Sequence, residues 1–345
     1  MRNNRNPFID FIKGMLILGI VYGHFVNSFS KVSNIHSFFH LMIRTFDLPF
    51  FMLISGYLLS LTIEKYTLRS ALINKISKIA RPAFVFGAFF ALVTYAVIGD
   101  ISVKSIIRYI SGIWFIWSML ICSIVVIVVT KSLKKIKYQI LLLCMFQIVF
   151  HLLPSNPWNI NYMFPFFVIG FYLKSIRSHT TFLNSKMLRY CAFFTFILLL
   201  SEWKESFTIW NSNGQWLSNT FGSTVAIALY RFTIGITGCF CAYSIYMMFY
   251  NNLDSSFTKT VCSFGKESLM IYIVHSFLVS QCFTSALEMA CYRLDNLGGG
   301  VLEDHSRFIL IVVAPVFTVL TCKCIVEIVK MLKKTRKISS LVFGT

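Results

Sequence analysis

The first apolar run, FIDFIKGMLILGIVYGH, carries two side chains that could do chemistry within a hydrocarbon layer, Lys13 and His24. They are eleven positions apart, so on an α-helix they share a face to within roughly 20° and lie about 16 Å apart along the axis. Too distant to exchange a proton directly, they suit a site that one substrate enters from each side of a membrane. A snorkelling Lys13 and a His24 that is only hydrogen-bonded within a bundle fit the same spacing equally well.

Later apolar runs contain further polar or helix-breaking groups. The second run reads FDLPFFMLISGYLLS, and Pro49 and Gly56 interrupt it; the interruption either lines a cavity or is a packing kink. Arg231 lies in the eighth run and His275 in the ninth. An intramembrane Arg needs a partner or a hydrated cavity, so we expect Arg231 to be functional.

A basic segment, LRSALINKISKIARP, follows the second run and is expected to be a loop. Lys75, Lys78 and Arg81 stand close together before Pro82 and would attract phosphate. Taken alone, the segment is better explained by the excess of cations that cytoplasmic loops carry. Further along, the tryptophan Trp114, in SGIWFIWSML, is expected in an aromatic belt at a membrane interface.

The amino-acid composition indicates that the polar residues named above lie in membrane-spanning segments. Of 345 residues, 57% are hydrophobic and only 13% are charged, and the mean hydropathy is +0.71. A soluble domain runs nearer half apolar and a quarter charged. The net charge of +19 is spread from connection to connection rather than gathered on one face, which indicates membrane topology and excludes nucleic-acid binding. Cysteine and histidine show no metal-ligand spacing, so no metal is expected.

The apolar runs predict an all-α, polytopic transmembrane bundle of about ten spans. Their boundaries lie near 11–29, 41–62, 82–99, 111–130, 138–153, 160–173, 190–207, 221–249, 268–287 and 308–329. Alternate connections, such as 65–81, 131–137 and 174–189, hold about three times as many Lys and Arg as the others. Both termini are therefore expected in the cytoplasm. The connections are too short for a separate core, so we expect one integral-membrane domain over 1–345, in a bacterial inner membrane.

Seven fragments in order resemble the integral-membrane acyltransferase-3 family, particularly its fucose-O-acetylase-like branch. They are R-x4-D-x2-KG-x9-H, PFF-x3-SGY, a basic segment ending in RP, WF, FPFF-x2-G, a lone membrane Arg, and G-x2-SL-x-IY-x2-H. Together they span residues 5 to 275. Two departures stand out: the family often has Arg where this chain has Lys13, and His where it has Asp47. If that His binds the acceptor, the acceptor or its orientation differs here.

The resemblance implies acetyl transfer from cytoplasmic acetyl-CoA, a co-substrate rather than a tightly bound cofactor, to an extracytoplasmic or lipid-linked glycan. His24 is the expected catalytic group, as a base or as a transient acetyl carrier. The expected donor-binding residues are Lys13, Lys75, Lys78 and Arg81. The candidates for placing the acceptor or supporting the transition state are Asp47, Ser55, Tyr57, Trp114, Arg231 and His275. Membrane lipids are the other expected partner.

A transporter or flippase for a lipid-linked glycan is the rival interpretation, because intramembrane charges and broken helices also serve transport. Labelled acetyl-CoA separates the two, since a transporter would leave no acetyl group on any glycan.

The charge pattern makes a testable prediction about topology. Reporter fusions after Lys137 and after Arg189 should report the cytoplasm, and fusions near Asn156 and Asn213 should report the opposite side, because cations are retained on the cytoplasmic side. The reverse pattern at the first two positions would falsify this orientation.

Overall fold

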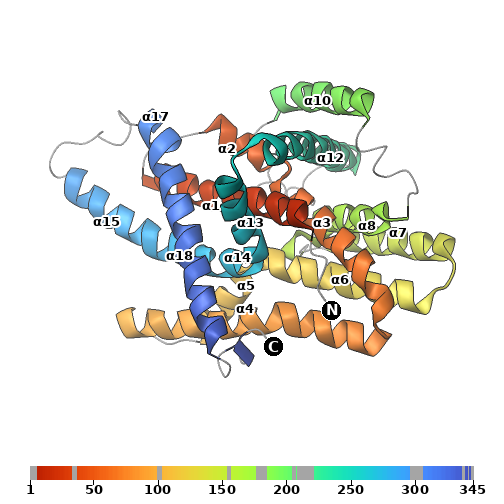
Figure 1. Ribbon diagram of the computed structural model, residues 1–345, viewed down its shortest axis with the longest axis horizontal. Helices are drawn as coiled ribbons and strands as arrows, with labels where there is room; N and C mark the ends of the chain where they lie inside the picture. Colours follow the sequence, from red (N-terminus) through yellow and green to blue (C-terminus); the bar gives the residue numbers. More distant parts are fainter. Residues whose placement is uncertain are drawn as a thin grey trace. The chain divides into compact units, whose positions relative to one another are not determined.

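The structure is a computed structural model. It describes residues 6–32, 37–98, 103–153, 157–175, 185–203, 207, 221–295, 306–335, 339–340 and 342. Every regular element in these ranges is a helix (Figure 1), which confirms the all-α prediction. Helices cover most of the described part of each of the ten predicted spans. Six described helices are long and apolar enough to cross a membrane, and three shorter apolar helices accompany them. The number of spans and the side of the termini stay predictions, and Asn156 and Asn213 lie outside the described residues.

The helices form two compact units, of which the first combines Met1–Arg44, Pro82–Ile113 and Tyr246–Thr345. Two short π-helical stretches, η5 (Leu278–Phe283) and η6 (Ile309–Val313), interrupt its later helices. Its α-helices are α1 (Pro7–Val32), α2 (Phe38–Ile43), the later part of α4 (Leu68–Ile98), α5 (Val103–Gly112), α13 (Ser255–Lys266), α14 (Ser268–Phe277), α15 (Thr284–Asp295), α17 (Ser306–Phe308) and α18 (Ala314–Lys334).

Helix α1 is the centre of the first unit, in contact with α13, α14, α15 and α18. Its closest approach is to α13, where glycine removes the side chains between the two backbones. A methyl group at Gly14 would overlap the carbonyl oxygen of Val261, and one at Gly265 would overlap that of Asp10. Small residues allow this kind of close crossing in membranes, where dispersion replaces the hydrophobic effect as the driving force.

The second unit combines Thr45–Arg81 and Trp114–Ile245. Its closest crossing repeats the first: a methyl group at Gly56 would overlap the carbonyl oxygen of Phe167, and one at Gly170 would overlap that of Leu53. The unit contains α3 (Asp47–Thr62), η1 (Ile63–Lys65), the first part of α4, α6 (Trp114–Ser132), α7 (Ile136–Leu152), η2 (Pro157–Asn159), α8 (Ile160–Leu173), α10 (Lys186–Ser201) and most of α12 (Phe221–Asn252).

The break expected around Pro49 and Gly56 lies elsewhere. The chain turns at residues 44–46, and α3 then runs without interruption from Asp47 to Thr62. Pro49 is the third residue of α3, where a missing N–H breaks no intrahelical bond. Gly56 is the packing position against α8. Of the two interpretations of this run, the structure supports packing at Gly56.

The prediction of a loop before Pro82 was wrong. Residues 68–81 form the first half of α4, and the helix continues through Pro82. The segment contains no Gly and has an amphipathic pattern: Ala71, Ile79 and Ala80 are buried, whereas Lys78 and Arg81 are exposed. Burial of one face favours a helix over a loop even where basic residues are frequent.

The two glycine crossings predict which glycines tolerate substitution. Gly56→Ala should lower the free energy of unfolding by about 1–3 kcal/mol, because a methyl group must displace backbone. Gly112→Ala, in α5, is the matched control, since nothing lies within 4 Å of its added Cβ; this change should be neutral or stabilising. Thermal unfolding in detergent measures both, and equal melting temperatures for Gly56→Ala and wild type would contradict the crossing.

Candidate functional site

The structure brings His24 and His275 together within the first unit. Their ring centroids are 4.9 Å apart, with an edge-to-face angle of 69°. His24 lies on α1 and is half-buried, whereas His275 lies on α14 and is fully buried. Tyr272, one turn earlier on α14, places its ring 5.4 Å from that of His275. Two imidazoles that the sequence separates by most of the chain therefore form one site.

The hydrogen bond of His275 defines what its ring can offer. Its Nδ1 lies 2.8 Å from the carbonyl oxygen of Ile271. Because a carbonyl only accepts, we assign the Nδ1 proton to this bond, which leaves Nε2 of a neutral ring as an acceptor. Nε2 is buried and has no hydrogen-bond partner among the described residues. It can accept a proton donor such as a substrate hydroxyl, a water or an N–H of a neighbouring imidazole.

A hydroxyl pair connects the His24 backbone to the π-helical stretch after His275. Ser28 Oγ donates to the carbonyl oxygen of His24 at 2.9 Å and lies 2.7 Å from Thr284 Oγ1. Thr284 Oγ1 also lies 3.0 Å from the carbonyl oxygen of Val279, and its proton is shared between this carbonyl and Ser28 Oγ. The second π-helical stretch also contacts α1, through a hydrogen bond from the Tyr22 hydroxyl to the carbonyl oxygen of Leu310 at 3.4 Å. Single π-helical turns are frequent at functional sites.

His40 is a third histidine that sequence reasoning missed. It is 6% exposed, and its Nε2 would lie 2.8 Å from a Cβ added to Gly23. Gly23 precedes His24 directly, so its missing side chain makes room for a second imidazole against α1. The signal was this GH pair, because a glycine beside a candidate catalytic residue indicates close approach by another group.

The second unit holds Arg231, which is 3% exposed. Its guanidinium carbon lies 4.4 Å from the centre of the Tyr162 ring, and the Tyr162 hydroxyl donates to the Arg231 carbonyl oxygen at 3.5 Å. Asp47 and Arg231 both lie close enough to Tyr162 to interact with it electrostatically. A buried cation stacked on an aromatic ring is stabilised without losing its charge. Sequence reasoning missed Tyr162, one turn before Phe166 in the FPFF fragment.

Asp47 is 6% exposed at the start of α3, where its Oδ1 accepts a hydrogen bond from the N–H of Leu48 at 2.6 Å. A carboxylate at a helix N-terminus is stabilised by the helix dipole. In the same helix, Ser55 donates to the sulfur of Met119 at 3.3 Å, and Tyr57 lies within electrostatic range of Tyr243.

The predicted donor-binding residues lie on two helices. Lys13 is half-buried on α1, which is continuous from Pro7 to Val32, so the calculated spacing to His24 applies. Lys75, Lys78 and Arg81 are three positions apart on α4 and share one side of it. Trp114 begins α6 and contacts Phe115, its ring centroid 6.0 Å away.

Comparison with known proteins identifies the family. The family profile described as the acyltransferase domain (Acyl_transf_3) matches residues 6–330. This chain belongs to the acyltransferase-3 family. Nodulation protein NolL of Sinorhizobium fredii (strain NBRC 101917 / NGR234) is 30% identical to this chain over 186 residues, which cover 49% of this chain and 49% of NolL. The match thus spans about half of that relative. No solved structure matches this chain.

The first unit contains side chains whose chemistry suits acyl transfer. Imidazole serves acyl transfer either as a general base for a hydroxyl or as a nucleophile. Within the described ranges, no group of three His, Cys, Asp or Glu side chains is placed to hold a metal ion. The paired rings of His24 and His275 are therefore the candidate active site.

The ring contact predicts that the two histidines act as a unit. His24→Ala and His275→Ala should each reduce acyl transfer strongly, and the double variant should lose little more than the worse single variant. The expected coupling is about 0.5–3 kcal/mol, as for residues in contact. The turnover rates of the purified wild type, the two single variants and the double variant give this coupling energy. His151→Ala, on α7, is the control and should stay near wild type; fully additive losses for the pair would show that the rings act independently.

Proposed function

We propose that this acyltransferase moves an acetyl group from cytoplasmic acetyl-CoA to a hydroxyl of an extracytoplasmic or lipid-linked surface glycan in a bacterial inner membrane. The observation that carries the proposal is the contact of His24 with the buried His275 in an acyltransferase-3 protein. The motif resemblance supplies the donor and the acceptor class. The apolar helices support a reaction within a bilayer.

His24 is the catalytic group in this proposal. In direct transfer, it takes the proton of the sugar hydroxyl while that oxygen attacks the acetyl carbonyl. The C–S bond of the thioester then breaks, and the CoA sulfur leaves as a thiolate that takes up the proton. In the two-step variant, His24 attacks the carbonyl first, the C–S bond breaks and the CoA sulfur leaves as a thiolate. The sugar hydroxyl then displaces the acetyl group from His24, and the hydroxyl proton passes to the released imidazole. The two routes form the same products.

His275 acts as a positioning residue for His24. Its Nδ1–H is held by the Ile271 carbonyl, so Nε2 is available to accept a hydrogen bond from a ring N–H or from the acceptor hydroxyl. Fixing the orientation of a catalytic imidazole through a second group is a recurrent device in acyl transfer. Burial of His275 keeps bulk water from competing for this lone pair.

Lys13 and the cations of α4 hold the phosphates of CoA in this proposal. Lys13 lies on the predicted cytoplasmic half of α1, about 16 Å below His24 along the axis, a depth that an extended pantetheine arm covers. A lysine makes a point-charge contact with phosphate rather than a bidentate one. Arg231, held by Tyr162, is proposed to polarise the acyl carbonyl or to place the acceptor.

A binding and turnover assay with labelled acetyl-CoA tests this division of roles. Lys13→Ala should weaken CoA binding roughly ten- to a hundred-fold, since one charge-assisted contact is worth about 1.5–3 kcal/mol. Lys13→Arg should retain substantial activity. His24→Ala should abolish transfer and leave CoA binding nearly intact, because imidazole acts on the acyl group.

Two outcomes would overturn the proposal. If glycans carried no label after incubation with the wild-type protein and labelled acetyl-CoA, acetyl transfer would be ruled out. That result is the one expected of a transporter. Wild-type turnover in a stably inserted His24→Ala variant would reduce His24 to a packing residue. Structural analysis of surface glycans from cells with and without the intact gene identifies the modified hydroxyl.

A further inference from the structure

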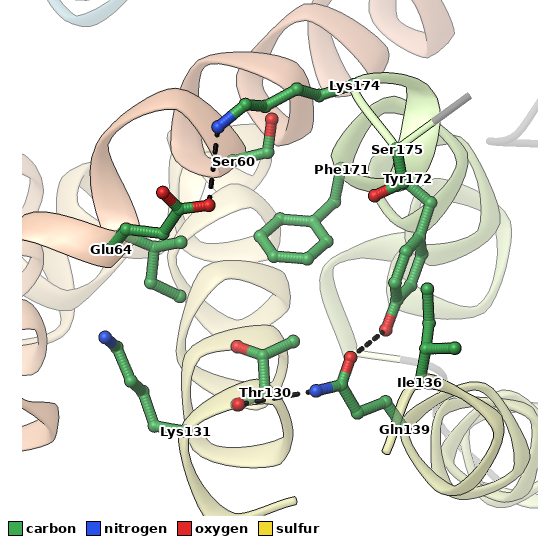
Figure 2. A pocket seen from close by; sticks show the side chains of 11 residues that line it. Ser60, Glu64, Thr130, Lys131, Ile136, Gln139, Phe171, Tyr172, Lys174 and Ser175 are labelled. Atoms are coloured by element: carbon green, nitrogen blue, oxygen red, sulfur yellow. Dashed lines mark hydrogen bonds and ion pairs between the residues drawn. The ribbon is translucent and has the colours of Figure 1, made fainter. Parts of the chain in front are cut away.

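A pocket of about 240 Å³ lies within the second unit, away from both histidines in the chain (Figure 2). It is formed where α3 and η1 end, α6 ends, α7 begins and α8 ends. By the charge pattern of the connections, this end of the helices is the predicted cytoplasmic one. The pocket is independent of the proposed acyl transfer.

The polar floor of the pocket is held in place by its own hydrogen bonds. The Tyr172 hydroxyl donates to Gln139 Oε1 at 3.0 Å, and Gln139 Nε2 donates to the carbonyl oxygen of Leu133 at 2.7 Å. These bonds tie the end of α8 to the connection between α6 and α7. The pocket is therefore preformed and loses little entropy when it is filled.

Two lysines give the pocket a positive rim. Lys174 Nζ lies 3.4 Å from Glu64 Oε1, an ion pair whose side chains are 41% and 79% exposed. Lys131, at the last turn of α6, has no hydrogen-bond or ion-pair partner among the described residues. It is half-buried, and Figure 2 shows it extending toward the side where Glu64 and Lys174 lie. A half-buried ammonium without a partner is stabilised by an anion placed between the two lysines.

The mouth of the pocket adjoins an apolar surface. Ile136 lines the pocket and is 50% exposed, and the same helix goes on to expose Ile140 at 45% and Leu141 at 58%. Apolar side chains on the outside of a membrane helix face acyl chains. A water-soluble phosphate compound would leave this apolar surface without a contact. A phospholipid would contact both parts, with its phosphate between the two lysines and its acyl chains along α7.

We propose that this pocket binds the headgroup of an anionic phospholipid, with the phosphate between Lys131 and Lys174. Basic pockets between transmembrane helices on the cytoplasmic side are suited to acidic lipid headgroups. Glu64 competes with the lipid for Lys174. The hydroxyl of Ser175, which also lines the pocket, is within the same rim and can donate to a glycerol or phosphate oxygen.

Native mass spectrometry of the purified full chain, titrated with phosphatidylglycerol or phosphatidylcholine, tests the site. Phosphatidylglycerol should bind more tightly than phosphatidylcholine, and Lys131→Ala with Lys174→Ala should reduce its affinity by about ten-fold or more. Glu64→Gln should increase the affinity about two- to five-fold, since breaking an exposed pair releases Lys174. A merely structural role for these residues would not produce that gain.

Lys134→Ala is the matched control, because Lys134 is an exposed cation on the same connection and does not line the pocket. It should bind phosphatidylglycerol like wild type, and melting temperatures confirm that all variants are folded. Equal binding of the two lipids, or wild-type binding by the double variant, would overturn the proposal. If CoA displaced phosphatidylglycerol and the double variant lost CoA affinity instead, the pocket would belong to the acyl donor.

Discussion

The first unit depends on a contact between the bare backbones of α1 and α13. Gly14 lies against the Val261 carbonyl of α13, and Gly265 lies against the Asp10 carbonyl of α1. His24 lies about 15 Å of helix beyond Gly14, and α14, which carries His275, begins two positions after α13 ends. Helix α14 also contacts α1, and its His275 meets His24 there. With no side chains between the two backbones, neither helix can slide along the other without a collision, so the start of α14, which follows α13 directly, is held near α1.

The second unit has the same kind of glycine crossing between two helices, and there it positions the partner of a buried arginine. The reciprocal contact of Gly56 with the Phe167 carbonyl and of Gly170 with the Leu53 carbonyl sets α3 against α8. Two turns before Gly170, Tyr162 then lies where its ring stacks on the buried Arg231. Fragments that look like signatures of chemistry, SGY and FPFF-x2-G, thus owe their glycines to packing. Tyr162, the aromatic partner of Arg231, lies two turns away on one of the helices that these glycines align.

Periodicity and apolar length were sufficient to predict the helices, because both are local properties of the chain. Lys13, His24, Arg231 and His275 could be singled out one at a time, since a polar group in an apolar run is conspicuous by itself. Their grouping was not predictable from spacing: that His275 touches His24 depends on which helix packs against α1. His40 was missed because its sequence neighbours are unremarkable and its burial comes from Gly23. The basic half of α4 was predicted as a loop because its cations are conspicuous in the sequence, whereas the pattern of its buried face is weaker.

The crossing of α1 with α13 also has a consequence for synthesis of the chain. Gly265 leaves the ribosome 251 residues after Gly14, roughly 12–50 s later at about 5–20 residues per second. During that interval α1 must stay in the bilayer with a half-buried lysine, a histidine and a glycine face that no partner covers. Its retention then depends on its own apolar length and on the helices made soon after it. The candidate active site therefore forms only after α14 has been made, although the helix that carries His24 is the first of the described helices to be made.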